Sequence, residues 1–270
     1  MDAELKSITQ VLLPMIPWPS RARLKAAVER IDDLVYGIIN ARRAAPGDQH
    51  DLLTLLIEAR DDEGQGMSDK QLRDEVLTLY VAGHETTANT LSWTWVLLAQ
   101  HPAVRATLES ELTSVLGGRT PTLEDVPSLP YTEAVIKEAM RFYPPIWTIS
   151  RVASQDVEIG GYAIPQGTEI YMSQWVTHRD GRWFELPERF LPERWIDGLE
   201  QRLPKYAYFP FGGGPRICIG NRFAMMEAIL LLATIAQHYR LDLRENQPVE
   251  RDASLTLRPK HGIEMQLRRR

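Results

Sequence analysis

The chain has little cysteine and no long apolar run. Its 270 residues include one cysteine, Cys218. One cysteine forms no internal disulfide and supplies no multi-cysteine zinc or iron-sulfur site, so Cys218 is a structural thiol, a nucleophile or a lone metal ligand. No stretch reaches the roughly 18 consecutive apolar residues of a membrane span, and Asp2 and Glu4 stand where a signal peptide would carry positive charge. We therefore expect a cytoplasmic protein without a membrane span.

A basic surface is also missing. The net charge is −5, and apart from the Arg268 to Arg270 tail the basic residues are scattered, so nothing favours nucleic acid. What is present is an ordinary globular composition, 44% hydrophobic and 25% charged, in a chain long enough for a sizeable core. We expect a folded protein that does not bind nucleic acid.

The apolar residues mostly recur at helical spacing. A capping box at Ser68 and Gln71 predicts the start of a helix of more than thirty residues, which should cross the middle of the molecule and end near His101. Short strand-like runs follow at 157–159 and 169–172, and weak strand alternation at 241–267. The other predicted helices cover 1–15, 21–43, 51–60, 103–116, 131–142 and 221–239. The pattern indicates a mainly α fold, a helical body with a small β sheet.

The segment Phe211-Gly-Gly-Gly-Pro-Arg-Ile-Cys-Ile-Gly220 is the most informative in the chain. Its glycines and proline predict a tight loop that delivers Cys218 just ahead of a helix. A helix N-terminus and loop N–H groups favour negatively charged sulfur, as a nucleophile or metal ligand requires. Arg216 adds a positive charge that could pair with a carboxylate on a ligand.

Two phosphate-binding interpretations of this loop fail on residue identity. A dinucleotide fingerprint that starts at Gly212 needs glycine where Ile217 stands, and no Gly-Lys-Ser/Thr follows for a phosphate loop. A cysteine hydrolase would need a histidine brought close in the fold, which the residues leave open.

The same segment resembles the heme-ligand loop of the cytochromes P-450, Phe-x-x-Gly-x-Arg-x-Cys-x-Gly, at every specified position. The resemblance implies that Cys218 is the axial thiolate of a heme and that Arg216 pairs with a heme propionate. It places Phe211 and Gly220 in the cofactor-binding loop and implies heme b (iron protoporphyrin IX) as the cofactor.

The centre of the long predicted helix, Ala82-Gly-His-Glu-Thr-Thr87, carries an acid and two hydroxyls among apolar residues. It resembles the oxygen-activation motif of the same family, in which Ala82 and Gly83 would leave space beside the heme while Glu85 and Thr86 relay protons to dioxygen. The alternative is a kinked core helix whose threonines bond back to carbonyls. A zinc-protease pattern is excluded because Ala88 replaces its second histidine.

Glu138 and Arg141, three residues apart, would by themselves be a solvated surface pair. Within the resemblance they match the family's Glu-x-x-Arg, and Pro192-Glu-Arg-Trp195 matches its later Pro-Glu-Arg segment. The resemblance then implies that Arg194 joins the pair in a buried network that fixes the cysteine loop. It also implies that Arg151 binds a second propionate, and that residues 144–149 line part of the substrate site.

The motifs follow the family's order from about residue 20 to the end. A complete member is longer, so we expect residues 1–270 to form a single partial heme-binding domain, either a shortened product or a fragment, with weakened cofactor binding in isolation. The implied function is a monooxygenase that inserts one atom of O2 into an apolar small molecule. Electrons would come from NAD(P)H through a redox partner, a ferredoxin or a flavoprotein reductase. The alternatives are a peroxide-using heme-thiolate enzyme, which would not need Glu85 and Thr86, and a truncated, non-catalytic heme-binding or interaction protein.

Overall fold

The computed structural model describes residues 18–45, 51–245 and 247–270, and the helix expected over residues 1–15 lies outside them. The chain divides into two compact units, residues 1–82 and 83–270. In the part of the chain that the structure describes, no helix is long and apolar enough to span a membrane.

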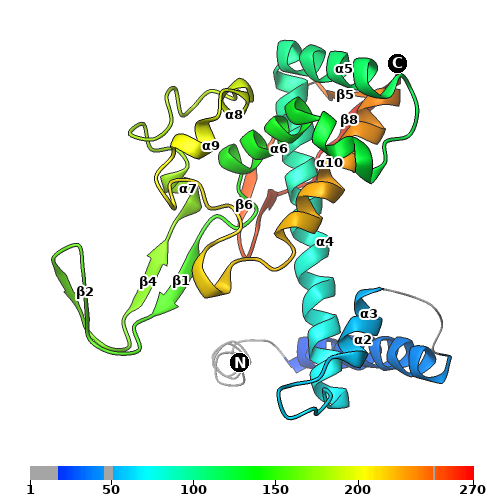
Figure 1. The fold of residues 1–270 in the computed structure, drawn as a ribbon, viewed down its shortest axis with the longest axis vertical. Helices are drawn as coiled ribbons and strands as arrows, with labels where there is room; N and C mark the ends of the chain where they lie inside the picture. The colour runs from blue at the N-terminus through cyan, green and yellow to red at the C-terminus, as the bar shows by residue number, and fades with distance from the viewer. Residues whose placement is uncertain (1–17, 46–50, 246) are drawn as a thin grey trace. The chain divides into compact units, whose positions relative to one another are not determined.

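The first unit is built on α2 (Trp18–Ala44), α3 (Leu52–Glu58) and the start of α4 (Asp69–Gln100) (Figure 1). Val35 and Ile39 of α2 and Leu72 of α4 form its small core. Arg73 pairs with Asp32 beside that core. α2 begins at Trp18, three residues before the start of the helix expected over residues 21–43.

The second unit holds the main core. Four helices contribute to it: the last turns of α4, α5 (Pro102–Leu116), α6 (Pro130–Phe142) and α10 (Asn221–His238). Its most deeply buried apolar side chains are Leu97, Leu98, Leu108, Leu112, Leu129, Val135, Ile136 and Leu232. Short helical segments occupy the connections: η2 (Leu123–Ser128), α7 (Gln174–Thr177), α8 (Glu193–Ile196), α9 (Leu199–Arg202) and η3 (Gly214–Arg216).

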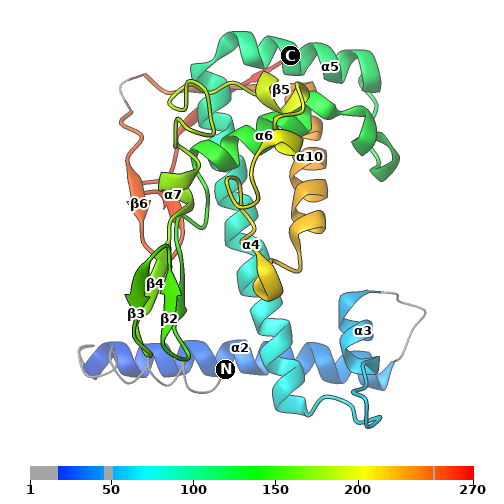
Figure 2. The ribbon, with the colours of Figure 1, turned by 60° about the vertical axis from the view of Figure 1, so that its left-hand side comes forward.

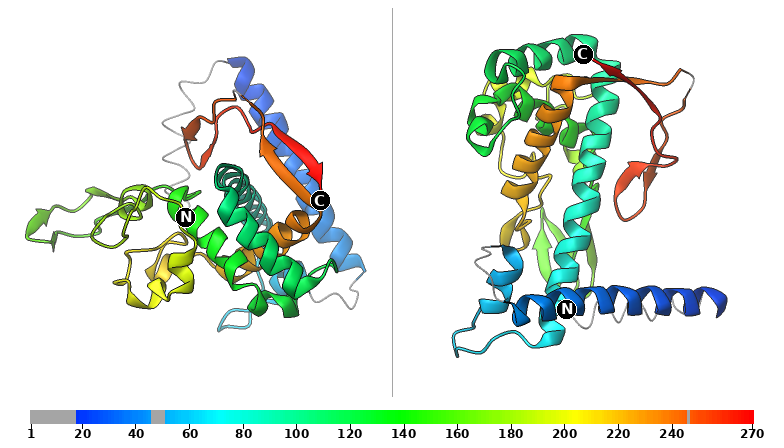
Figure 3. Two further views of the ribbon diagram at one scale, coloured as in Figure 1. Left: turned by 90° about the horizontal axis from the view of Figure 1, so that it is seen from above. Right: turned by 90° about the vertical axis from the view of Figure 1, so that its right-hand side faces the viewer.

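The strands of the second unit form antiparallel pairs. β1 (Ile149–Val152) pairs with β4 (Glu169–Met172), and β2 (Val157–Ile159) with β3 (Tyr162–Ile164), one beyond the other in Figure 2. Near the C-terminus, β5 (Tyr239–Leu243) pairs with β8 (Met265–Arg269), the orange and red strands of Figure 3, and β6 (Arg251–Ala253) with β7 (Leu257–Pro259). The predicted mainly α fold is therefore confirmed, with two-stranded sheets in place of one small sheet.

The long predicted helix is confirmed as α4, and its capping box is formed. The Ser68 N–H donates to Gln71 Oε1 (2.9 Å), and the Gln71 N–H donates back to Ser68 Oγ (3.3 Å). Apart from Leu72, the buried residues of α4 lie in its C-terminal half: Tyr80 is 70% exposed, whereas Trp93 is 1% exposed. The expectation that this helix crosses the middle of the molecule thus fails for the exposed residues of its first half.

Candidate functional site

Cys218 lies in the loop between η3 and α10, three residues ahead of the first residue of α10. Its N–H donates to the carbonyl oxygen of Phe211 (2.9 Å), and the Phe211 side chain packs against the main core. The thiol itself is exposed, and among the described residues no side chain hydrogen-bonds to the sulfur. The backbone of the loop is therefore anchored to the core while the sulfur is left open to a ligand.

The three consecutive glycines of this loop serve two different needs. Gly212 and Gly214 have φ angles of 72° and 68°, in the left-handed region that favours glycine. Gly213 is extended (φ −172°), so its backbone would accept any residue. A Cβ at Gly213 would instead overlap the ring of Tyr206, with Cδ1 only 3.1 Å away. The loop thus needs glycine at 212 and 214 for their backbone angles, and at 213 because the Tyr206 ring lies close to its backbone.

The surroundings of the sulfur fit a flat, largely apolar cofactor that carries carboxylates. Ile219, next to Cys218, is 91% exposed and Phe223, in the first turn of α10, is 62% exposed, so the loop and the start of α10 present uncovered apolar side chains. Gly220 leaves the space beside the sulfur open, since even a Cβ there would stand 4.0 Å from Sγ. Arg216 is exposed in the same loop and can meet an anionic group. These residues suit a heme with its propionates.

The predicted oxygen-activation motif lies on α4. Ala82 and Gly83 are exposed, and a Cβ at Gly83 would meet nothing within 4 Å, so packing within the protein does not require this glycine. Glu85 and Thr86 are half-buried, and α4 continues through them without a break.

Thr256 is the residue that holds Glu85. The Thr256 hydroxyl donates to Glu85 Oε1 (2.6 Å) and accepts from Asn89 Nδ2 (3.2 Å). Thr256 is buried just before β7, 171 residues along the chain from Glu85. A lone threonine in a weakly patterned tail has no sequence signature, so sequence reasoning missed it.

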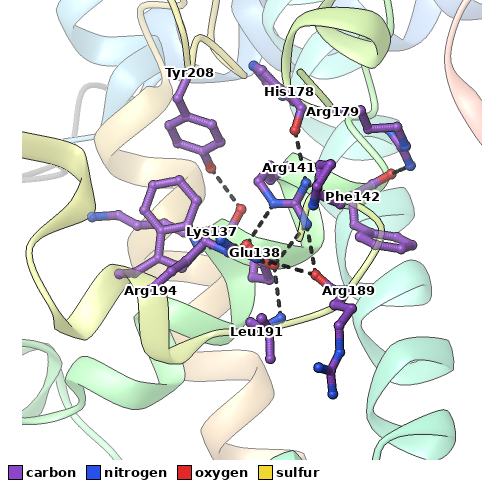
Figure 4. A network of polar contacts seen from close by, with 12 residues as sticks. Lys137, Glu138, Arg141, Phe142, His178, Arg179, Arg189, Leu191, Arg194 and Tyr208 are labelled. Atoms are coloured by element: carbon purple, nitrogen blue, oxygen red, sulfur yellow. Dashed lines mark hydrogen bonds and ion pairs between the residues drawn. The ribbon is translucent and has the colours of Figure 1, made fainter. Parts of the chain in front are cut away.

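Glu138, Arg141 and Arg194 meet in one buried network (Figure 4). Glu138 and Arg141 have fully buried side chains on α6, and two of their N–O distances are 2.9 Å. Arg194 Nε reaches Glu138 Oε1 at 3.1 Å. Two further donors complete the carboxylate: the Leu191 N–H and the Trp195 indole N–H, each at 2.9 Å. The carboxylate therefore has partners for both oxygens, as a buried charge requires.

The Arg141 guanidinium also hydrogen-bonds to the backbone that follows β4. It donates to the carbonyl oxygens of His178 (2.9 Å), Pro187 (2.8 Å) and Arg189 (3.1 Å). Arg189, which stands in a second Pro-Glu-Arg segment at 187–189, lies in this network through its carbonyl oxygen, while its side chain is exposed. The network thereby ties α6 to the irregular stretch that leads to the cysteine loop.

Arg151 is on β1, opposite Ile170 of β4. Its guanidinium is exposed and donates to the neighbouring Ser150 carbonyl oxygen (2.7 Å). Among the described residues it has no hydrogen bond to the cysteine loop, so its assignment to a propionate stays a prediction.

The segment expected to line the substrate site is tied to the C-terminal strands. The Leu257 N–H donates to the Pro145 carbonyl oxygen (2.8 Å), and the Trp147 indole N–H donates to the Ser254 carbonyl oxygen (3.0 Å). The residues just after α6 are therefore fixed to the stretch that carries Thr256.

The structure has a thiol just ahead of a helix, a buried charge network and a mainly helical body. These are the features expected of the heme-thiolate class of proteins. The family model for Cytochrome P450 matches residues 3–267, and the chain belongs to this family. It is 41% identical over 232 residues to "Cyclooctatin synthase" from Streptomyces melanosporofaciens, covering 85% of this chain and 50% of that protein. It is also 41% identical over 231 residues to "Cyclooctat-9-en-7-ol 5-monooxygenase" from the same organism, with 85% and 50% coverage.

The fold agrees with this family. A crystal structure of a cytochrome P450 (CYP102L1) superimposes with a TM-score of 0.85 at 32% identity, covering 94% of this chain and 58% of that one. The predicted cytochrome P-450 fold is therefore confirmed. The chain spans about half the length of the curated relatives it matches.

Proposed function

We propose that residues 1–270 form a single partial heme-binding domain of a heme-thiolate monooxygenase. The observation that carries the proposal is the exposed Cys218 sulfur, presented by a loop whose Phe211 side chain packs against the core. Support for one domain comes from the family match, which extends over 3–267. Support for oxygen insertion comes from a relative whose name is that of a monooxygenase.

Within this proposal, Cys218 supplies the thiolate ligand of heme b, and Arg216 and Arg151 pair with its propionates. Phe211 anchors the loop, and Gly220, Ala82 and Gly83 leave room for the ring. When bound, the heme supplies the electron transfer and dioxygen activation that side chains cannot perform.

The protein's own contribution is to hold and move protons and to orient the substrate. Glu85, fixed by the Thr256 hydroxyl, presents a carboxylate that can pass a proton, and Thr86 offers the next hydroxyl on the same helix. A dioxygen-using enzyme requires Glu85 and Thr86, whereas a peroxide-using enzyme does not. The presence of both residues therefore supports the use of dioxygen. The substrate is an apolar small molecule, and electrons reach the site from NAD(P)H through a ferredoxin or a flavoprotein reductase.

The experiment is heme loading of the purified chain, followed by the spectrum of the reduced carbon monoxide complex. The wild type should take up heme and give the thiolate-type band after which the family is named, and Cys218→Ser should abolish that band. Arg216→Gln should weaken heme retention, with Arg222→Gln, on the first turn of α10, as the matched control. A wild-type chain that takes up no heme would favour the non-catalytic alternative.

A further inference from the structure

His178 is a buried histidine whose imidazole has no role in the site described so far. It follows α7 directly, and its side chain is fully buried. The imidazole packs against the rings of Tyr208 (centroid distance 5.0 Å) and Phe209 (5.3 Å). These aromatic residues immediately precede the cysteine loop, so the imidazole lies at its base.

His178 joins the charge network to this loop through two separate hydrogen bonds. Its carbonyl oxygen accepts from Arg141 Nη1 (2.9 Å), and its ring nitrogen Nε2 accepts from the Phe209 N–H (2.9 Å). One residue thus contacts Arg141 of the fully buried Glu138–Arg141 pair (Figure 4) and also the backbone that leads to the sulfur.

Two backbone turns continue from Phe209 to the cysteine. The Phe209 carbonyl oxygen accepts from the Gly212 N–H (2.9 Å), and the Phe211 carbonyl oxygen accepts from the Cys218 N–H (2.9 Å). Hydrogen bonds and short backbone segments therefore connect the imidazole, through the base of the loop, to Cys218.

The imidazole can act as an acceptor only when it is neutral, with its proton on Nδ1. Burial, helped by the positive charges of Arg141 and Arg179, lowers the pKa of His178 to about 3. Nδ1 has no hydrogen bond of good geometry, and a backbone contact with Met140 offsets only part of this shift. Glu138, the nearby carboxylate, is already paired with Arg141 and Arg194. The ring is therefore neutral at neutral pH.

We propose that His178 is a positioning residue for Cys218, in which the neutral imidazole holds the Phe209 N–H and so sets where the cysteine loop leaves the buried network. The hydrogen bond between the imidazole and the Phe209 N–H is established by its geometry, whatever cofactor the chain binds. Its consequence for the ligation of heme rests on the proposed function.

A matched pair of variants separates the acceptor from the bulk of the ring. In His178→Gln a side-chain oxygen can replace Nε2 as the acceptor, whereas His178→Met places a methyl group there in a side chain of similar length. The measurement is hydrogen exchange of the Phe209 amide in the full chain by NMR, with the Leu232 amide in α10 as the control.

We expect His178→Met to speed exchange at Phe209 about tenfold or more, because the Phe209 N–H loses its acceptor, while His178→Gln stays within about threefold of the wild type. The Leu232 amide should be unchanged in both. Equal acceleration in the two variants, or no acceleration in His178→Met, would overturn the proposal.

Should His178→Met not fold, the ring tautomer of the wild-type protein decides. Imidazole ¹⁵N shifts must show the proton on Nδ1, and a proton on Nε2 refutes the proposal. Heme loading is measured separately: failure of the wild type to bind heme sinks the proposed function without touching the exchange result. In loaded protein, His178→Met should give a smaller share of the thiolate-type band than His178→Gln.

Discussion

Replacing Glu138 with glutamine tests the buried network most directly. The change removes one negative charge from a site where its carboxylate accepts from two guanidinium groups, an indole N–H and a backbone N–H. The fully buried Arg141 would keep its charge and lose its counterion. Breaking a buried pair from one side typically costs about 3–5 kcal/mol, a large share of the roughly 5–15 kcal/mol that stabilises a native fold.

The assay is urea unfolding with linear extrapolation to water. The matched control is Glu133→Gln on the same helix, because Glu133 pairs with Lys137 (2.8 Å) and its side chain is 40% exposed. That pair should contribute less than about 1 kcal/mol. If Glu138→Gln lowered the free energy of unfolding by no more than the control does, the argument that this network holds the region together would be wrong.

Three further changes probe other parts of the site. Because the pKa of His178 falls from 6.5 to about 3 on folding, the unfolded chain binds the extra proton below pH 6.5, so stability should drop by about 2 kcal/mol between pH 7 and pH 5. His178→Gln should lack this component in pH-dependent urea titrations, and an identical slope in wild type and variant would contradict it. Gly213→Ala should destabilise by up to about 1 kcal/mol, because the half-exposed Tyr206 ring has to shift away from the added Cβ, and Tyr206→Ala should relieve most of that loss in a double-mutant cycle; purely additive effects would count against the contact. Thr256→Val removes the donor to Glu85 and should lower the free energy of urea unfolding by about 1–3 kcal/mol, whereas an unchanged midpoint would show that Glu85 does not depend on this hydroxyl.

Local chemistry in the sequence was enough for most of the elements. The Ser68 and Gln71 pair marked the start of α4, and the glycines after residue 211 marked the cysteine loop. Both signals are short-range, since they depend on capping and on backbone angles within a few residues. The strands at 157–159 and 169–172 were predicted within the same limits, because the turns around them are local.

The sequence by itself determined the family, the position of the cysteine ahead of a helix and the charged residues of the network, because each lies in a short run of specific residues. Tertiary structure alone decided that Thr256 holds Glu85 and that His178 bonds to Phe209. It also decided that Gly213 is needed for the Tyr206 ring rather than for its backbone angle. The two hydrogen bonds join residues far apart in the chain, and the ring contact joins residues seven positions apart across a loop. The local sequence does not specify which distant donor or ring will contact a given residue, because such contacts form only when the elements pack together.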